Sequence, residues 1–241
     1  MSTRSSIQAH IVYDNNPYDE RLKTDWGLSC FVEGLNKSIL FDTGTKGRIL
    51  LSNMKTLGIQ PEKIDVVVLS HAHGDHSGGL EDLLSLNPKI EVWLHNHFSS
   101  DFRERIRKKA ANVIEVEGSQ KICEGAYTSG VINGWIKEQS LVLDTEDGLS
   151  LITGCAHPRI VNVISRVTEL FKKEITLAMG GFHLGGFERL EIKEIINRFR
   201  DFKVQKVGPC HCSGNDARRL FQEEYQNDFL EIGVGKEITI Q

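Results

Sequence analysis

Hydrophobic positions along the chain follow two patterns: short apolar runs of strand length and longer segments with helical periodicity. The apolar run within residues 64–69 predicts a strand that is buried on both faces of a sheet. Residues 46–57 follow a helical pattern that ends at Gly58, a residue type that suits the left-handed end of a helix. Together the two patterns predict an α/β protein.

The same patterns continue to the end of the chain without an internal repeat or a flexible linker. We therefore expect residues 1–241 to form a single domain, with strands in the middle and helices on both outer faces. Further strands are expected at residues 7–13, 29–33, 38–41, 90–94, 114–116, 126–131, 140–143, 149–153, 175–179, 206–207 and 236–240. Further helices are expected at residues 79–86, 98–111, 160–171, 190–202 and 217–225.

Composition narrows the class of protein. The chain is 39% hydrophobic and 26% charged, which is typical of a soluble globular protein. Its net charge of -4 argues against broad electrostatic binding of nucleic acid. No apolar stretch approaches the ~20 residues that span a bilayer, and residues 1–6 lack the apolar segment of a secretory signal. The five cysteines form no dense disulfide framework, so we expect a reducing, cytoplasmic setting.

Four potential metal ligands occur within six residues, directly after the expected buried strand. The run is His71-Ala-His73-Gly-Asp75-His76. Imidazole and carboxylate are good ligands for zinc, iron and manganese. A tight turn at Gly74 can aim alternate side chains at neighbouring points, so two adjacent metal sites are feasible. Paired metals suit hydrolysis and displacement reactions.

The pattern HxHxDH after a buried strand resembles the signature of the metallo-β-lactamase fold superfamily, and Asp42-Thr-Gly44 resembles an upstream element of that superfamily. Further stretches resemble one branch, commonly named after the methanogen enzyme ribofuranosylaminobenzene 5'-phosphate synthase, many of whose bacterial members are called metal-dependent hydrolases. These stretches are residues 27–29, 78–80, 154–158 (GCAHP), 180–184 (GGFHL) and 208–214 (GPCHCSG). The resemblance implies a four-layer αββα sandwich with metals at one edge, on loops that follow strands.

The resemblance also implies a ligand set. His71 and His73 correspond to ligands of a first metal, and Asp75 and His76 to ligands of a second. Asp75 is also expected to orient or deprotonate the attacking water in a hydrolytic relative. The nucleophile would be a metal-bound hydroxide, because a divalent metal lowers the pKa of its water towards ~7. The implied cofactor is one or two divalent ions, zinc first, with iron or manganese as alternatives.

Two more histidines are expected to complete this set from distant strand ends. His157 follows the strand at 149–153, although Pro158 also fits the first turn of a helix, which would make His157 a structural residue. His211 lies in a Pro-Cys-His-Cys setting that resembles the last metal-binding position of the superfamily; the alternative is a loop histidine bonded to backbone.

At Cys155 the sequence departs from the superfamily pattern. A Gly-Asp pair, whose aspartate bridges the metals, is commonly expected where Gly154-Cys155 stands. The thiolate of Cys155 would then be a metal or pocket residue, or the position would be silent. A centre with one metal is therefore an alternative to a centre with two.

Other polar residues near the strand ends are candidates for substrate contacts. His183, between paired glycines and a helix, is expected to act as a general acid or to contact the substrate. Asn15 is a candidate substrate-binding residue, with a turn as the alternative. His95 and His97 alternate along a strand end and so point the same way, which makes them candidates for the pocket rim; the alternatives are that they cap the strand or face solvent.

Two surface features have a structural and a functional interpretation. The basic helix at 98–111 is expected to be a solvated face, and it would steer an anionic substrate if it lay near the cleft. Trp26 and Trp135, near glycines, are either packing residues or aromatic walls of the pocket.

Three functions are compatible with these residues. We favour a metal-dependent hydrolase of a small, anionic molecule, with a phosphate-bearing substrate as one candidate. The first alternative is a synthase or transferase of the pterin or aminobenzoate type, as the branch name implies. The second is a non-catalytic metal- or ligand-binding sensor, which the intact run at 71–76 disfavours. Nucleic-acid cleavage is disfavoured because the chain lacks a sizeable RNA-binding arm, and a redox di-iron protein because other residues replace its carboxylates.

Overall fold

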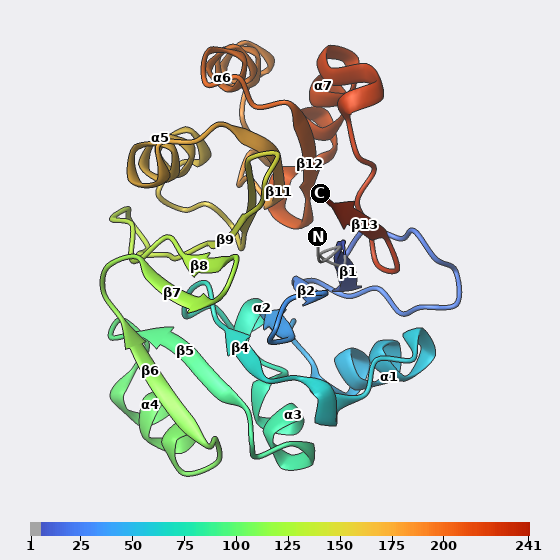
Figure 1. Ribbon diagram of the computed structural model, residues 1–241. Helices are drawn as coiled ribbons and strands as arrows, with labels where there is room; N and C mark the ends of the chain where they lie inside the picture. Colours follow the sequence, from blue (N-terminus) through green and yellow to red (C-terminus); the bar gives the residue numbers. More distant parts are fainter. Residues whose placement is uncertain (1–5) are drawn as a thin grey trace, which may run out of the picture.

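Two sheets face each other at the centre of the computed structural model, which describes residues 6–241 (Figure 1). Residues 1–5, part of the N-terminus expected to lack a secretory signal, lie outside the described residues. One sheet has the strand order β13-β1-β2-β3-β4-β5-β6, and the other has the order β12-β11-β10-β9-β8-β7. Helices α1, α3 and α4 lie on the outer side of the first sheet, and α5, α6 and α7 on that of the second (Figure 1). The expected αββα sandwich is confirmed.

The bounds of the elements are as follows. The strands are β1 Ile7–Tyr13, β2 Ser29–Glu33, β3 Ile39–Phe41, β4 Val66–Val68, β5 Glu91–His95, β6 Asn112–Val116, β7 Gln120–Cys123, β8 Ala126–Thr128, β9 Leu141–Asp144, β10 Leu149–Thr153, β11 Ile175–Gly181, β12 Lys206–Cys210 and β13 Glu237–Ile240. The α-helices are α1 Gly47–Leu57, α2 Gly74–Ser77, α3 Leu80–Leu86, α4 Ser100–Arg107, α5 Ile160–Phe171, α6 Arg189–Asp201 and α7 Asn215–Tyr225. Short 3-10 turns occupy Pro61–Lys63, His211–Ser213 and Gln226–Asp228.

Strand β4 shows why its sequence is continuously apolar. Val66 and Val68 pack into the cluster between the two sheets, whereas Val67 packs into the cluster under α1 and α3. Successive side chains of a strand point to opposite faces, so a strand covered on both sides needs apolar residues throughout. The layered fold therefore has three clusters of buried apolar side chains: one between the sheets and one under each set of helices.

Chain direction places many loops at one edge of each sheet. In the first sheet β1 and β3 run the same way, because each is antiparallel to β2, and β4 and β5 are parallel to β3. In the second sheet β10, β11 and β12 are parallel to one another. The carboxyl ends of parallel strands meet at one edge, and loops beyond that edge commonly form sites. The segments that follow these strands therefore contain the candidate residues.

Some expected elements differ in length. The basic helix α4 begins after Ser99, whose hydroxyl accepts from the backbone N–H of Phe102, and ends at Arg107, so it is shorter than residues 98–111. The strand expected at 126–131 stops at Thr128, because Gly130 has a φ of 72° and lies against the backbone of Gly118. Strand β7 and the one-turn helix α2 were not expected, since each is too short to give a periodic pattern.

Candidate metal centre

The run His71 to His76 leaves the edge of the first sheet directly after β4. Helix α2 begins at Gly74, with His73 as the residue before it, and the helical turn brings the side chain of His76 back towards His71. The ring centroids of His71 and His76 are 4.3 Å apart, and both side chains are fully buried. Alternate side chains of the run thus reach neighbouring points, as the spacing predicted.

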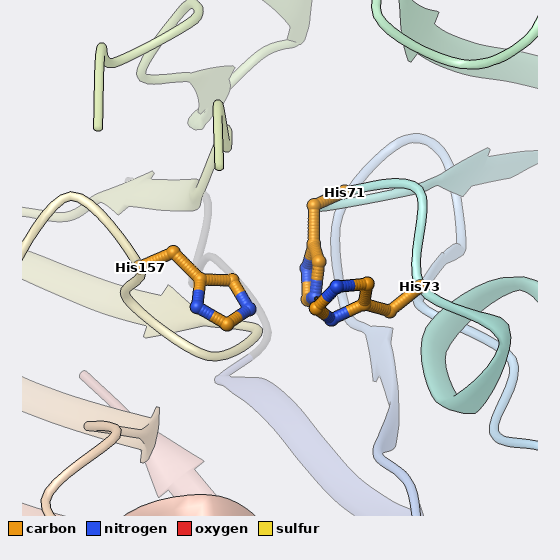
Figure 2. Close-up of side chains that lie close together, drawn as sticks. All are labelled: His71, His73 and His157. Atoms are coloured by element: carbon orange, nitrogen blue, oxygen red, sulfur yellow. Dashed lines mark hydrogen bonds between the residues drawn. The ribbon is translucent and has the colours of Figure 1, made fainter. Parts of the chain in front are cut away.

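One group of three histidines joins the two sheets. His71 and His73 approach from the loop after β4 and His157 from the loop after β10, with their rings converging (Figure 2). Ligand nitrogens of the three residues lie within 4.8 Å of one another, and His71 Nε2 is 3.1 Å from His73 Nδ1. Neither ring nitrogen of the buried His157 has a hydrogen-bond partner among residues 6–241. Buried nitrogens left unpaired are costly, and a metal cation would satisfy the one that carries no proton.

A second group combines a carboxylate with two histidines. Ligand atoms of Asp75, His76 and His211 lie within 4.8 Å of one another. Oδ2 of Asp75 is 3.6 Å from Nε2 of His76 and 3.3 Å from Nε2 of His211. The structure therefore brings all six residues expected as metal ligands together, in two adjacent groups whose donors suit zinc, iron or manganese.

Asp42, which follows β3, orients His71 and His76 through hydrogen bonds. Its Oδ1 accepts the Ser70 backbone N–H at 2.7 Å, and its Oδ2 accepts from the Ser70 hydroxyl and from Nδ1 of His76, each at 2.7 Å. Because the Ser70 hydroxyl proton points to Asp42, the Ser70 oxygen is free to accept from Nδ1 of His71 at 2.9 Å. Both Nε2 atoms then face the centre, which is the usual way a carboxylate directs a metal-binding histidine.

Glu138 holds the turn that carries His157. It is buried and accepts the backbone N–H groups of Cys155, Ala156 and His157 at 2.8 to 2.9 Å. Burial raises the pKa of Glu138, against the effect of these three donors. Our sequence reasoning missed this residue. The available signal was a Glu-Gln-Ser run directly before an apolar strand, which no periodicity distinguishes from a loop.

Asn15, a candidate substrate contact, bonds a histidine of the second group. Its Oδ1 lies 2.9 Å from Nδ1 of His211, and its Nδ2 donates to the backbone carbonyl of His211 at 3.2 Å. An acceptor on Nδ1 makes that nitrogen the N–H donor and leaves Nε2 of His211 to face Asp75. Asn15 therefore positions a candidate ligand.

His95 is not brought to the centre. Its side chain is fully buried beside Phe98, and its Nδ1 accepts the backbone N–H of His97 at 3.3 Å. Burial lowers the pKa of His95 to about 4. The pocket-rim position expected for His95 is wrong, because β5 is covered on both faces up to its last residue.

Electrostatics keeps the histidines of the first group neutral and favours the charged forms of His76 and Asp75 in the second. Burial, followed by the neighbouring His76, holds the pKa of His71 well below its ordinary value, and burial lowers the pKa of His157 to about 3. Burial would also lower the pKa of His76, but Asp42 outweighs it and raises that pKa to about 9. The pKa of Asp75 is lowered despite burial, because His211 and His76 surround it. Neutral imidazoles and an anionic carboxylate are the forms that bind metals, so His76 would release its Nε2 proton when a metal binds.

Four candidate-site loops contain strained backbone. Asp42, Ala156, His183 and His211 have positive φ values between 49° and 58°, a region that residues other than glycine seldom adopt. They follow β3, β10, β11 and β12, whereas the segment after β4 that carries His71 to His76 has none. Strain of this kind clusters at functional sites, where the surrounding structure maintains it.

Aromatic rings flank the centre at the surface. Trp26 is 54% exposed and its ring lies 4.9 Å from that of His211, whereas Trp135 is 73% exposed and lies 5.0 Å from His157. Beside Trp135 a cavity of about 460 Å³ is lined by His157, His183 and Arg159, together with apolar side chains. This cavity gives a small molecule access to His157 of the first histidine group.

The basic helix α4 is a solvated face. Arg103 and Arg107 pair with Glu115, and Arg105 and Lys109 pair with Glu81. None of these side chains lines the cavity beside Trp135. Among residues 6–241, no helix combines the length and apolarity that a bilayer span requires.

Comparison with known proteins places the chain in a family. Residues 27–167, more than half of the chain, match the family model of the metallo-beta-lactamase superfamily, so the chain belongs to that superfamily. The match contains the run at 71–76 and His157. Members of this superfamily are metal-dependent enzymes, and the two groups of candidate ligands agree with that property.

Individual relatives extend the similarity to nearly the whole chain. The 7,8-dihydropterin-6-methyl-4-(beta-D-ribofuranosyl)-aminobenzene-5'-phosphate synthase of Methanocaldococcus jannaschii is 29% identical, over 91% of each chain. An uncharacterized protein of the same organism is 30% identical, over 95% of this chain and 99% of the relative. The solved structure of Tm1679, described as a metal-dependent hydrolase of the beta-lactamase superfamily, has 27% identity and a TM-score of 0.82 over 97% of this chain and 99% of its own.

Proposed function

We propose that the protein is a metal-dependent hydrolase that acts on a small, anionic molecule at the centre formed by His71, His73, Asp75, His76, His157 and His211. One observation carries the proposal: neutral histidine nitrogens from both sheets converge, and both ring nitrogens of the buried His157 lack a partner among residues 6–241. Zinc suits this nitrogen-rich set, with iron or manganese as alternatives. When bound, the metal would supply Lewis acidity and activate water.

The side chains around the centre divide the remaining tasks. Asp75 is the half-buried member of the second group and would orient the attacking water or accept a proton from it. His183 lines the cavity, and contact with Cys212 raises its pKa, so it can hold a proton for the leaving group. Arg159 lines the same cavity and would attract an anionic group of the substrate.

The setting we propose is the cytoplasm. All five cysteines, each within the described part of the chain, are free thiols. Thiols stay reduced in a cytosolic environment, whereas secreted proteins commonly pair them.

The test is hydrolysis by the metal-loaded protein. Purified protein containing zinc, iron or manganese is incubated with panels of phosphodiesters, lactones and thioesters, beside the His71→Ala variant. We expect metal-dependent turnover of at least one anionic class, with a large loss of both metal and turnover in His71→Ala. Unchanged metal content in that variant would remove His71 from the ligand set, and absence of turnover with every panel would count against a hydrolase.

A synthase is the second candidate, and the relative from Methanocaldococcus jannaschii favours it. Such an enzyme would use the same histidine groups but exclude water, so that an organic group attacks. Incubation with a dihydropterin compound and a β-D-ribofuranosylaminobenzene 5'-phosphate, followed by mass spectrometry of a joined product, distinguishes the two reactions. A protein that binds metal and shows neither reaction would be a sensor.

A further inference from the structure

The thiol of Cys155 lies between the two groups of candidate ligands. Its sulfur is within 4.8 Å of the donor atoms of His71 and His76, of His157 and His183, and of His211 and Cys212. His71 and His157 belong to the first group, whereas His76 and His211 belong to the second. A single buried sulfur atom, 3.2 Å from Nε2 of His76, therefore reaches both groups.

No other described residue joins as many potential metal-binding groups as Cys155. It is a member of three of the five such groups in residues 6–241, whereas Cys212 is a member of one. A ligand shared by two adjacent metals must lie within reach of both sets of terminal ligands. The position of the Cys155 sulfur meets that requirement.

The surrounding backbone holds this sulfur in place. Glu138 accepts the backbone N–H of Cys155 at 2.8 Å. Gly154 and Gly181 allow close packing on either side: a Cβ at Gly154 would lie 2.2 Å from Oγ of Ser70, and a Cβ at Gly181 would lie 3.2 Å from Cα of Cys155. Neither glycine could be replaced without moving the loop that presents the thiol.

We propose that Cys155 is a metal ligand that bridges the two groups through its thiolate, in a centre that holds two metals. Binding releases the thiol proton to solvent, and the sulfur then forms one bond to each metal. A thiolate favours zinc and cobalt(II) over magnesium and manganese, which prefer oxygen ligands. The inference rests on the metal centre of the proposed hydrolase and adds the identity of its bridge.

Cobalt(II) gives a readout that is independent of activity. A cobalt–thiolate bond produces an intense charge-transfer absorption in the near ultraviolet, whereas cobalt bound by nitrogen and oxygen ligands alone shows only weak visible bands. Chelator-treated protein is reloaded with cobalt(II), its spectrum recorded and its bound metal counted. The chains compared are wild type, Cys155→Ser, Cys212→Ser as the neighbouring thiol, and Cys30→Ser as a core thiol that belongs to none of the groups of potential metal ligands.

We expect the charge-transfer band in wild type, Cys212→Ser and Cys30→Ser, and its loss in Cys155→Ser together with a fall from two bound cobalt ions to one. A band that survives in Cys155→Ser but disappears in Cys212→Ser would overturn the assignment. Wild-type protein that binds cobalt without the band would overturn thiolate ligation and leave the metal centre intact. Failure of wild type to bind any metal would instead defeat the proposed function.

The assignment of Cys155 as a ligand can be tested even if Cys155→Ser does not fold. If Cys155→Ser fails to fold, X-ray absorption at the zinc edge of the Cys212→Ser variant counts the sulfur ligands that remain without the neighbouring thiol. A zinc–sulfur contribution supports the bridge, and a shell made of nitrogen and oxygen only contradicts it.

Discussion

Asp42 and His76 form a fully buried pair in which Oδ2 of the carboxylate accepts from Nδ1 of the imidazole at 2.7 Å. The same oxygen accepts the hydroxyl proton of Ser70, which in turn bonds His71. The carboxylate of Asp42, the residue that follows β3, thus fixes the orientation of one histidine in each candidate group. Asp42 belongs to the Asp-Thr-Gly element that the sequence shares with the superfamily, and its position explains why that element accompanies the histidine run.

Replacing Asp42 should weaken metal binding. In Asp42→Asn an NH₂ group replaces one carboxylate oxygen, so either the Ser70 backbone N–H or both His76 and the Ser70 hydroxyl lose their acceptor. We expect metal affinity to fall about 10- to 100-fold, measured by competition with a chromophoric chelator. Asp201→Asn, on the exposed surface of α6, is the control and should bind metal like wild type. Equal affinities in the two variants would show that Asp42 has no orienting role.

Replacing His157 should remove bound metal without destabilising the metal-free protein. Its unpaired, buried nitrogens destabilise the metal-free protein, by about 1–3 kcal/mol for a typical unsatisfied polar group. We therefore expect His157→Ala to lose bound metal while its free energy of unfolding without metal stays equal to that of wild type or rises. Elemental analysis and urea denaturation of metal-free samples measure the two quantities. A strongly destabilised metal-free variant would indicate a packing role instead.

Glu138 should contribute mainly to stability. Glu138→Gln keeps one acceptor oxygen but places an NH₂ group against a backbone N–H of residues 155–157. Leaving that buried group without an acceptor should cost about 1–3 kcal/mol in the free energy of unfolding, measured by urea denaturation. Glu174→Gln, which removes only a surface ion pair with Lys203, should change this quantity by less than about 1 kcal/mol.

Acid should destabilise the fold through His95. Its folded pKa of about 4 lies below the ordinary value of about 6.5, so the unfolded chain takes up the proton first. Stability from neutral His95 is complete above pH 6.5 and is lost as the pH falls towards 4. Between pH 7 and pH 5 the loss should be about 2 kcal/mol.

The variant His95→Asn isolates this contribution. An asparagine oxygen can still accept the backbone N–H of His97 but does not titrate. Urea denaturation at pH 7 and pH 5 should show a smaller acid-induced loss in the variant than in wild type. Equal losses in the two proteins would assign the acid sensitivity to other groups.

Arg159 should determine preference for anionic substrates. It lines the cavity beside His157 and His183 but belongs to neither group of candidate ligands. For the substrate class that the hydrolysis panels identify, Arg159→Gln should raise KM about tenfold, the effect of losing one hydrogen bond to a charged group, with little change in kcat. Arg166→Gln, on the exposed side of α5, is the matched control. A fall in kcat at constant KM would place Arg159 in the chemical step instead.

Local patterns were sufficient for an α/β fold and for the run His71 to His76, whereas the four-layer arrangement and the roles expected for His157 and His211 came from the resemblance to the superfamily. The apolar run at β4 and the His71 to His76 spacing are contiguous in sequence, so both can be recognised without tertiary information. The roles of Glu138 and Asn15 could not be recognised in this way, because each depends on a contact with a residue elsewhere in the chain. The predicted position of His95 was wrong for a related reason. The alternation of side chains along a strand does not reveal which layer of the fold covers the end of that strand. That residues 1–241 act as one domain stays a prediction, which a single unfolding transition would support.

The candidate residues lie in segments that follow the strands, and this determines which substitutions the fold can accept. The apolar side chains that stabilise the layers lie within strands and helices, whereas the side chains assigned to metal and substrate follow the strands. Substitutions in the loops after β10, β11 and β12 can therefore alter specificity while the layers keep their packing. For directed evolution, libraries confined to these loops should retain folded members at a higher frequency than libraries of equal size in the strands.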